Sequence, residues 1–127
     1  PQIRSPADAA RLLMPRLSLL EQEEVHVIML DTRNRVLGIT QVYRGSLNAA
    51  SMRISELFRE AIRINAAAII VAHNHPSSDP SPSGQDIHVT REIIKAGKLL
   101  EMDTLDHIII GGTAFTSLKE RGLAFGE

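Results

Sequence analysis

Near the middle of the chain lies an uninterrupted run of seven apolar residues, from Ala66 to Ala72. A strand with apolar side chains on both faces must be covered on both faces, because either face would otherwise remain in water. We therefore predict that 66–74 forms the central strand of a sheet flanked by helices. The predicted fold class is α/β.

Helical and strand patterns alternate on both sides of this run. Helices are expected near 6–18, 55–65 and 84–101. Strands are expected over 25–30, 36–43, 105–110 and 114–116. Pro15 should end or kink the first helix near Met14, because proline lacks the N–H that a helix interior requires. The order helix, hairpin, helix, strand, helix, hairpin predicts one domain with a mixed sheet.

Composition narrows the classes of function. The 127 residues fit one domain, and 43% hydrophobic against 23% charged residues argues against disorder. The chain has no cysteine, which excludes disulfides and thiolate ligands, so any metal site must use His, Asp and Glu. No apolar stretch approaches the ~20 residues of a membrane-spanning helix, and we expect a cytoplasmic protein with no membrane partner. Position 1 is Pro rather than Met, so we also expect a fragment of a longer protein.

His73 and His75 stand where the central apolar run ends. In extended backbone, side chains two residues apart point to the same side, so both imidazoles can reach one metal ion. Asp86 lies about one turn into the third predicted helix, where the intervening loop can fold it back over the strand end. Two histidines and a carboxylate are a common zinc ligand set with one position left open. Asp79 is a competing carboxylate, but its Ser-Asp-Pro context favours a turn.

Two further positions meet the needs of a zinc hydrolase. Ser83 and Asp86 form a Ser-x-x-Asp pattern typical of a helix capping box, which by itself explains both residues. The Ser83 hydroxyl could in addition donate to an oxyanion beside the metal. A general base is also required, and Glu23 or Glu24 at the start of the first predicted strand could supply it. Strand alternation points these two carboxylates to opposite faces, and it leaves open which face carries the metal.

The pattern as a whole resembles a known motif. His73-x-His75, seven further residues and then Ser83-x-x-Asp86, with a glutamate upstream at a strand start, is similar to the JAMM (MPN+) metalloprotease motif. The resemblance implies that His73, His75 and Asp86 are zinc ligands. It also implies that Ser83 stabilises the tetrahedral intermediate, and that an upstream glutamate, which aligns best with Glu23, is the general base.

Flanking segments resemble the bacterial RadC family more specifically. They are His-Asn-His-Pro-Ser at 73–77, Leu-Asp-His-Ile-Ile-Ile-Gly at 105–111 and Ser-Leu-Lys-Glu-Arg-Gly at 117–122. The resemblance covers essentially all of residues 1–127, which implies a single RadC-like JAMM/MPN domain. Full-length members of that family also tend to carry an N-terminal helix-hairpin-helix domain, so we expect 1–127 to be the C-terminal part of such a protein.

Two functions compete. The first is a zinc-dependent hydrolase of peptide or isopeptide bonds, in which Glu23 takes the proton and Ser83 donates to the oxyanion. The alternative is a non-catalytic module of the same family, associated with DNA repair or protein interaction. The net charge of −1 and the 3% of aromatic residues argue against direct binding of nucleic acid. A zinc deaminase in its usual form is excluded, because it needs Cys ligands.

The remaining histidines lie outside this motif. Asp106 and His107 form a pair in a later predicted strand, and we favour a role that ties the sheet to a loop over one behind the metal ligands. His26 and His88 are expected to be structural or surface residues. His88 follows Asp86 by two positions on a helix, so it should point away from the metal.

Overall fold

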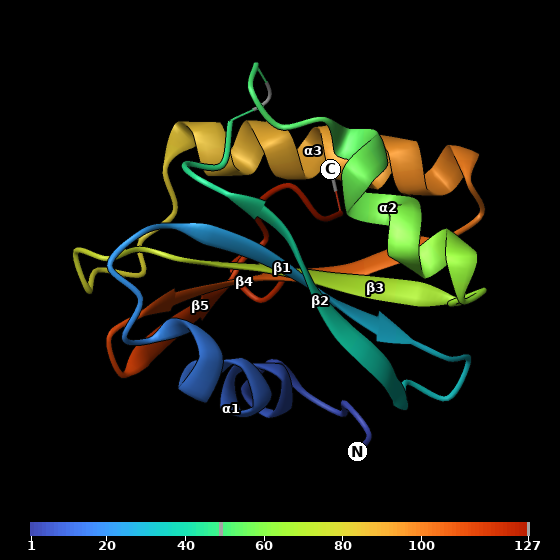
Figure 1. Ribbon diagram of the computed structural model, residues 1–127, viewed down its shortest axis with the longest axis horizontal. Helices are drawn as coiled ribbons and strands as arrows, with labels where there is room; N and C mark the ends of the chain where they lie inside the picture. Colours follow the sequence, from blue (N-terminus) through green and yellow to red (C-terminus); the bar gives the residue numbers. More distant parts are fainter. Residues whose placement is uncertain (49, 127) are drawn as a thin grey trace.

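Five strands form one mixed sheet through the centre of the molecule, and helices lie on both of its faces (Figure 1). The computed structural model describes residues 1–48 and 50–126. In chain order the elements are α1 (Pro6–Leu17), β1 (Glu24–Leu30), β2 (Val36–Arg44), α2 (Ile54–Arg63), β3 (Ala68–Asn74), α3 (Gly84–Leu99), β4 (Asp103–Gly111) and β5 (Ala114–Ser117). The predicted α/β class is confirmed, and every predicted element is present with its ends displaced by two residues at most.

The strand order is β2-β1-β3-β4-β5, with β3 at the centre as predicted. β3 pairs antiparallel with β1 and parallel with β4, which makes the sheet mixed. Every residue of β3 is buried. The apolar run is longer than the strand because Ala66 and Ala67 lie in the connection from α2, where the Ala67 N–H donates to the Leu30 carbonyl at 2.9 Å.

Two apolar clusters fill the spaces between the sheet and its helices. Alternate residues of β3 contribute to each cluster: Ile69 and Val71 face α2 and α3. Ile70 and Ala72 face α1. Figure 1 shows this layering, with α1 on one side of the sheet and α2 and α3 on the other. His73 continues the series of Ile69 and Val71, so its side chain points to the α3 side.

The first helix continues past its proline. α1 runs through Pro15 to Leu17, in agreement with the predicted range 6–18, so of the two effects predicted for Pro15 the helix end near Met14 is wrong. Leu13 and Leu17 are fully buried, and their burial stabilises the last turn. Pro15 itself is exposed, as is Arg11, whose carbonyl loses its helical partner. The missing hydrogen bond therefore lies on the solvent side of the helix, where a free carbonyl costs little.

No helix in residues 1–48 and 50–126 is both long enough and apolar enough to cross a bilayer. The longest described helix, α3, has 16 residues, whereas a membrane-spanning helix needs about 20.

Candidate metal centre

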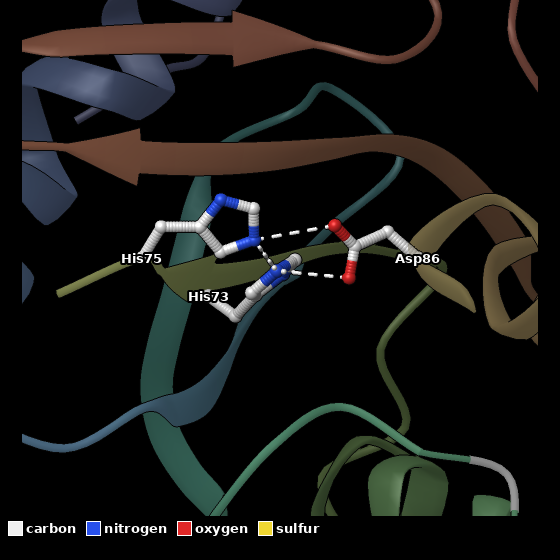
Figure 2. Close-up of side chains that lie close together, drawn as sticks. All are labelled: His73, His75 and Asp86. Atoms are coloured by element: carbon white, nitrogen blue, oxygen red, sulfur yellow. Dashed lines mark hydrogen bonds and ion pairs between the residues drawn. The ribbon is translucent and has the colours of Figure 1, made fainter. Parts of the chain in front are cut away.

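Three side chains with metal-ligating atoms converge where β3 ends and α3 begins (Figure 2). The Nε2 atoms of His73 and His75 lie 3.0 Å apart. These atoms lie 3.3 Å and 3.2 Å, respectively, from the two carboxylate oxygens of Asp86. His73 and Asp86 are buried, whereas His75 is partly exposed. The three side chains predicted from spacing therefore form one cluster, which solvent reaches from the side of His75.

A capping box at the start of α3 positions Asp86. The Ser83 N–H donates to Asp86 Oδ2 at 2.8 Å, and the Asp86 N–H donates to Ser83 Oγ at 3.0 Å. The carboxylate is thereby held at the helix N-terminus, and each of its oxygens lies next to one imidazole. The cap uses only a lone pair of the Ser83 hydroxyl, so the hydroxyl proton stays available for another acceptor.

The loop after β3 orients His75. Its Nδ1 lies 2.9 Å from the backbone carbonyl of Asp79. Because a carbonyl can only accept, Nδ1 carries a proton, and in the neutral imidazole Nε2 keeps its lone pair. The loop comes this close because Gly111 has no side chain: a Cβ there would lie 2.6 Å from Pro80 N and 2.8 Å from Asp79 C. The Asp79 carboxylate accepts from the Ser81 N–H at 3.0 Å, which agrees with the predicted turn.

The groups of the cluster strongly affect one another's protonation. Burial alone would raise the pKa of Asp86, but the adjoining imidazoles of His73 and His75 outweigh this and hold that pKa well below its usual range. The hydrogen bond with Asp86 raises the pKa of His75 against the opposing effect of burial, and the charge of Glu23 adds to the rise. A cation is therefore favoured between these side chains.

The donor set fits a metal ion. Imidazole nitrogen and carboxylate oxygen are ligands that divalent transition metals accept. Nitrogen lone pairs 3.0 Å apart, with carboxylate oxygens 3.2 Å and 3.3 Å away, repel one another unless a proton or a metal cation lies between them. His73, His75 and Asp86 thus form a group that could bind a metal.

The two candidate bases, Glu23 and Glu24, belong to opposite faces of the sheet. β1 pairs with β3 without interruption from Val25 opposite His73 onward, so alternation along β1 is intact. Val25 belongs to the cluster on the α3 side, and Glu23 shares its face by alternation. A bulge between β1 and β2 adds Val42 to β2 rather than a residue to β1, so it does not exchange the two glutamates.

Glu23 borders a hollow of about 420 Å³ that His75, Ser83 and Asp86 also line. The Leu47 N–H donates to Glu23 Oε2 at 3.3 Å, which holds the carboxylate at this position. The structure thus places the predicted base, the predicted oxyanion donor and two of the predicted ligands around one space.

Glu24 is not among the described residues that line this hollow. Its two carboxylate oxygens lie 3.0 Å from His26 Nε2 and 3.3 Å from Arg44 Nε. Glu24 and His26 are both buried, so these contacts are part of the packing near the start of β1. His88 is exposed on α3.

Asn74, between the two histidines, received no role from the spacing argument. Its side-chain carbonyl accepts from the Glu24 N–H at 2.8 Å, and its amide nitrogen donates to the Gln22 carbonyl at 3.0 Å. These bonds fix the backbone on both sides of Glu23. Asn74 therefore positions the candidate base. No sequence pattern indicates this role, because both of its partners lie about fifty positions away along the chain.

Asp106 and His107, which were paired in the prediction, have different contacts. The Asp106 carboxylate accepts from the Ser117 hydroxyl at 2.6 Å and from the Lys119 N–H at 3.2 Å. Asp106 therefore ties β4 to the segment at the end of β5, as expected. His107 Nε2 instead lies 2.7 Å from His73 Nδ1, behind the metal cluster. For His107 the structure supports the alternative interpretation.

A mixed sheet with a His-x-His strand end facing an aspartate at a helix start is the arrangement of a JAB/MPN-like α/β domain. The sequence of this chain matches the protein-family model of the RadC-like JAB domain over residues 3–123. The chain therefore belongs to the RadC family, which confirms the resemblance seen in its sequence.

Relatives with known sequences are similar over almost the whole chain. A UPF0758 protein of Roseiflexus castenholzii is 60% identical over 124 residues, which are 98% of this chain and 53% of that protein. A UPF0758 protein of Chloroflexus aurantiacus is 56% identical over 97% of this chain and 54% of its own length. A UPF0758 protein of Moorella thermoacetica is 51% identical over 95% of this chain and 53% of its own length. The chain spans about half the length of the curated relatives it matches.

Proposed function

We propose that this domain is a zinc-dependent metallohydrolase that cleaves peptide or isopeptide bonds. The observation that carries the proposal is the convergence of His73, His75 and Asp86, of which His75 and Asp86 line a hollow that Glu23 and Ser83 also border. Membership of a family with a JAB-like domain supports the same chemistry. The proposal concerns this domain, which is about half of its relatives' length.

The residues of the site divide the reaction between them. Zinc, held by His73, His75 and Asp86, would polarise the scissile carbonyl and lower the pKa of a water molecule toward ~7. Glu23 accepts a proton as the water oxygen bonds to the carbonyl carbon, and it delivers that proton to the amine when the C–N bond breaks. The Ser83 hydroxyl donates to the negative charge that develops on the carbonyl oxygen.

The direct test combines metal content with hydrolysis. We expect the purified 127-residue chain to retain about one zinc per molecule after dialysis at pH 7.5, and to cleave members of a peptide library. A chelator should abolish cleavage, and added zinc should restore it. A chain that retains no zinc, or that cleaves no peptide when loaded with zinc, would contradict the proposal and favour the non-catalytic alternative.

Zinc affinity should depend on pH through His75. Because the pKa of His75 is raised, the metal-free protein still holds a proton on this residue above about pH 6.5, the ordinary histidine value, and zinc must displace it. We expect the dissociation constant for zinc to rise about tenfold for each pH unit below the raised pKa, per proton displaced. Calorimetric titrations with zinc at several pH values between 6.0 and 8.5 measure this dissociation constant.

The melting temperature of the metal-free protein should fall as the pH rises, whereas zinc affinity should increase. The pairing of protonated His75 with Asp86 stabilises the fold fully below about pH 6.5 and is lost as the pH rises through the raised pKa. Burial lowers the pKa of His107, so that residue destabilises the fold only below about pH 6.5, outside this window. Metal-free protein should therefore melt lower at about pH 8.5 than at about pH 6.5. An exposed-site control, His88→Ala, should keep this trend, and a rising melting temperature would contradict the assignment.

A further inference from the structure

A series of buried hydrogen bonds connects the ring of His73 to the backbone of α3, on the side of the ring away from His75. His73 Nδ1 lies 2.7 Å from His107 Nε2, and His107 Nδ1 lies 2.5 Å from Thr90 Oγ1. The Thr90 hydroxyl in turn lies 2.7 Å from the backbone carbonyl of Asp86. His73 and His107 are 0% exposed and Thr90 is 1% exposed, so water does not replace any of these partners.

The position of each proton follows from the donors and acceptors. A carbonyl can only accept, so the single hydroxyl proton of Thr90 goes to Asp86 O. The Thr90 oxygen must then accept, and its donor is the Nδ1–H of His107. Neutral His107 therefore has a lone pair on Nε2, which accepts from His73 Nδ1–H. His73 is left with its own lone pair on Nε2, the atom that faces Asp86 and His75.

A bulge in β4 places His107 in this series. β3 and β4 pair Ile69 with Thr104 but Ile70 with Asp106, so Leu105 is an extra residue in β4. The insertion shifts the alternation of β4 by one position, which puts His107 on the same face as His73. Bulges that redirect a side chain are frequent next to active sites.

We propose that His107 and Thr90 are positioning residues for the metal centre: they hold His73 in the tautomer that leaves its Nε2 free to bind the metal. The inference rests on the proposed metal-dependent function. Without His107, the proton of His73 could move to Nε2, where the Asp86 carboxylate at 3.3 Å accepts it. A metal ion would then have to displace this proton.

His107→Leu removes the acceptor and provides the first test. We expect zinc to bind about 10- to 100-fold more weakly, the usual effect of losing a partner of a metal ligand. In the metal-free protein at pH 8, two-bond ¹H–¹⁵N spectra should show the His73 proton on Nδ1 in the wild type and on Nε2 in the variant. His107→Gln restores an oxygen acceptor near the former Nε2, and it should recover both readouts in part.

A threonine pair provides the matched test if His107→Leu does not fold. Thr90→Val removes only the hydroxyl and should weaken zinc binding in the same range, whereas Thr90→Ser should behave like the wild type. Thr116→Val is the control, because the buried Thr116 hydroxyl has no hydrogen-bond partner in the described part of the chain. Equal zinc affinity of Thr90→Val and Thr116→Val would overturn the proposal.

The spectra also separate this inference from the proposed function. A wild-type protein with the His73 proton on Nδ1 that binds no zinc would overturn the function and retain the role of His107 in fixing the tautomer. A metal-free wild type with the proton on Nε2 would overturn the role of His107, even if the protein binds zinc and cleaves peptides.

Discussion

Glu23→Gln should leave zinc bound and slow peptide hydrolysis by about 100-fold or more, within the ~10²–10⁴ range of general-base catalysis. Gln keeps the shape of the side chain and an oxygen that can accept from the Leu47 N–H, which is 3.3 Å from Glu23 Oε2 in the structure. An amide cannot take the proton of the attacking water, so the loss should appear in kcat. Glu23 is outside the His73, His75 and Asp86 cluster, so metal content should not change.

Glu24→Gln is the matched control for this variant. Glu24 contacts His26 and Arg44 and does not border the hollow. The kcat of the Glu24→Gln variant should therefore equal that of the wild type. An inactive Glu24→Gln beside an active Glu23→Gln would move the assignment by one residue. Loss of zinc from Glu23→Gln would show that Glu23 acts on metal binding rather than as a base.

His75→Ala should abolish the stabilisation that zinc confers. At a zinc concentration 100-fold above the dissociation constant, binding to the folded state contributes about 2.7 kcal/mol, which corresponds to a rise in Tm of roughly 10 °C for a domain of this size. With one of three ligands removed, we expect affinity to fall at least about 100-fold, because ~10–16 kcal/mol is shared among the ligands of a structural zinc site. Thermal unfolding with and without zinc measures the difference.

The design of this experiment separates metal loss from unfolding. At about pH 8.5 the pairing of protonated His75 with Asp86 is lost, so Ala at this partly exposed position should leave the metal-free Tm close to that of the metal-free wild type. His88→Ala replaces an exposed histidine on α3 and should retain the full response to zinc. A His75→Ala protein with the same zinc content and the same shift in Tm as the wild type would exclude His75 as a ligand.

Local sequence patterns were sufficient to predict the helices and strands, and to predict that the side chains of His73, His75 and Asp86 lie close together. The all-apolar run could only be a strand covered on both faces, and β3 is such a strand. The interval of two between His73 and His75 places both imidazoles on one side. The Ser83-x-x-Asp86 spacing predicted the capping box that holds the carboxylate. Each of these arguments needs only the few residues on either side.

Local sequence patterns were insufficient for features that depend on contacts with a segment distant in the sequence. Pro15 would end an isolated helix, but the burial of Leu13 and Leu17 against the sheet extends α1 beyond it. Asn74 has no visible role in the sequence, because both of its partners, the N–H of Glu24 and the carbonyl of Gln22, lie about fifty positions away along the chain.

The sequence by itself determined the order of elements and the residues that meet at the end of β3, because periodicity and capping are properties of neighbouring residues. Only the tertiary structure decided that Glu23 rather than Glu24 shares the face of His73, and that His107 lies behind that histidine. Alternation along a strand defines two sets of side chains but does not say which set faces which layer. The register between strands and the extra residue Leu105 in β4 make that choice, and both depend on pairing with a distant part of the chain.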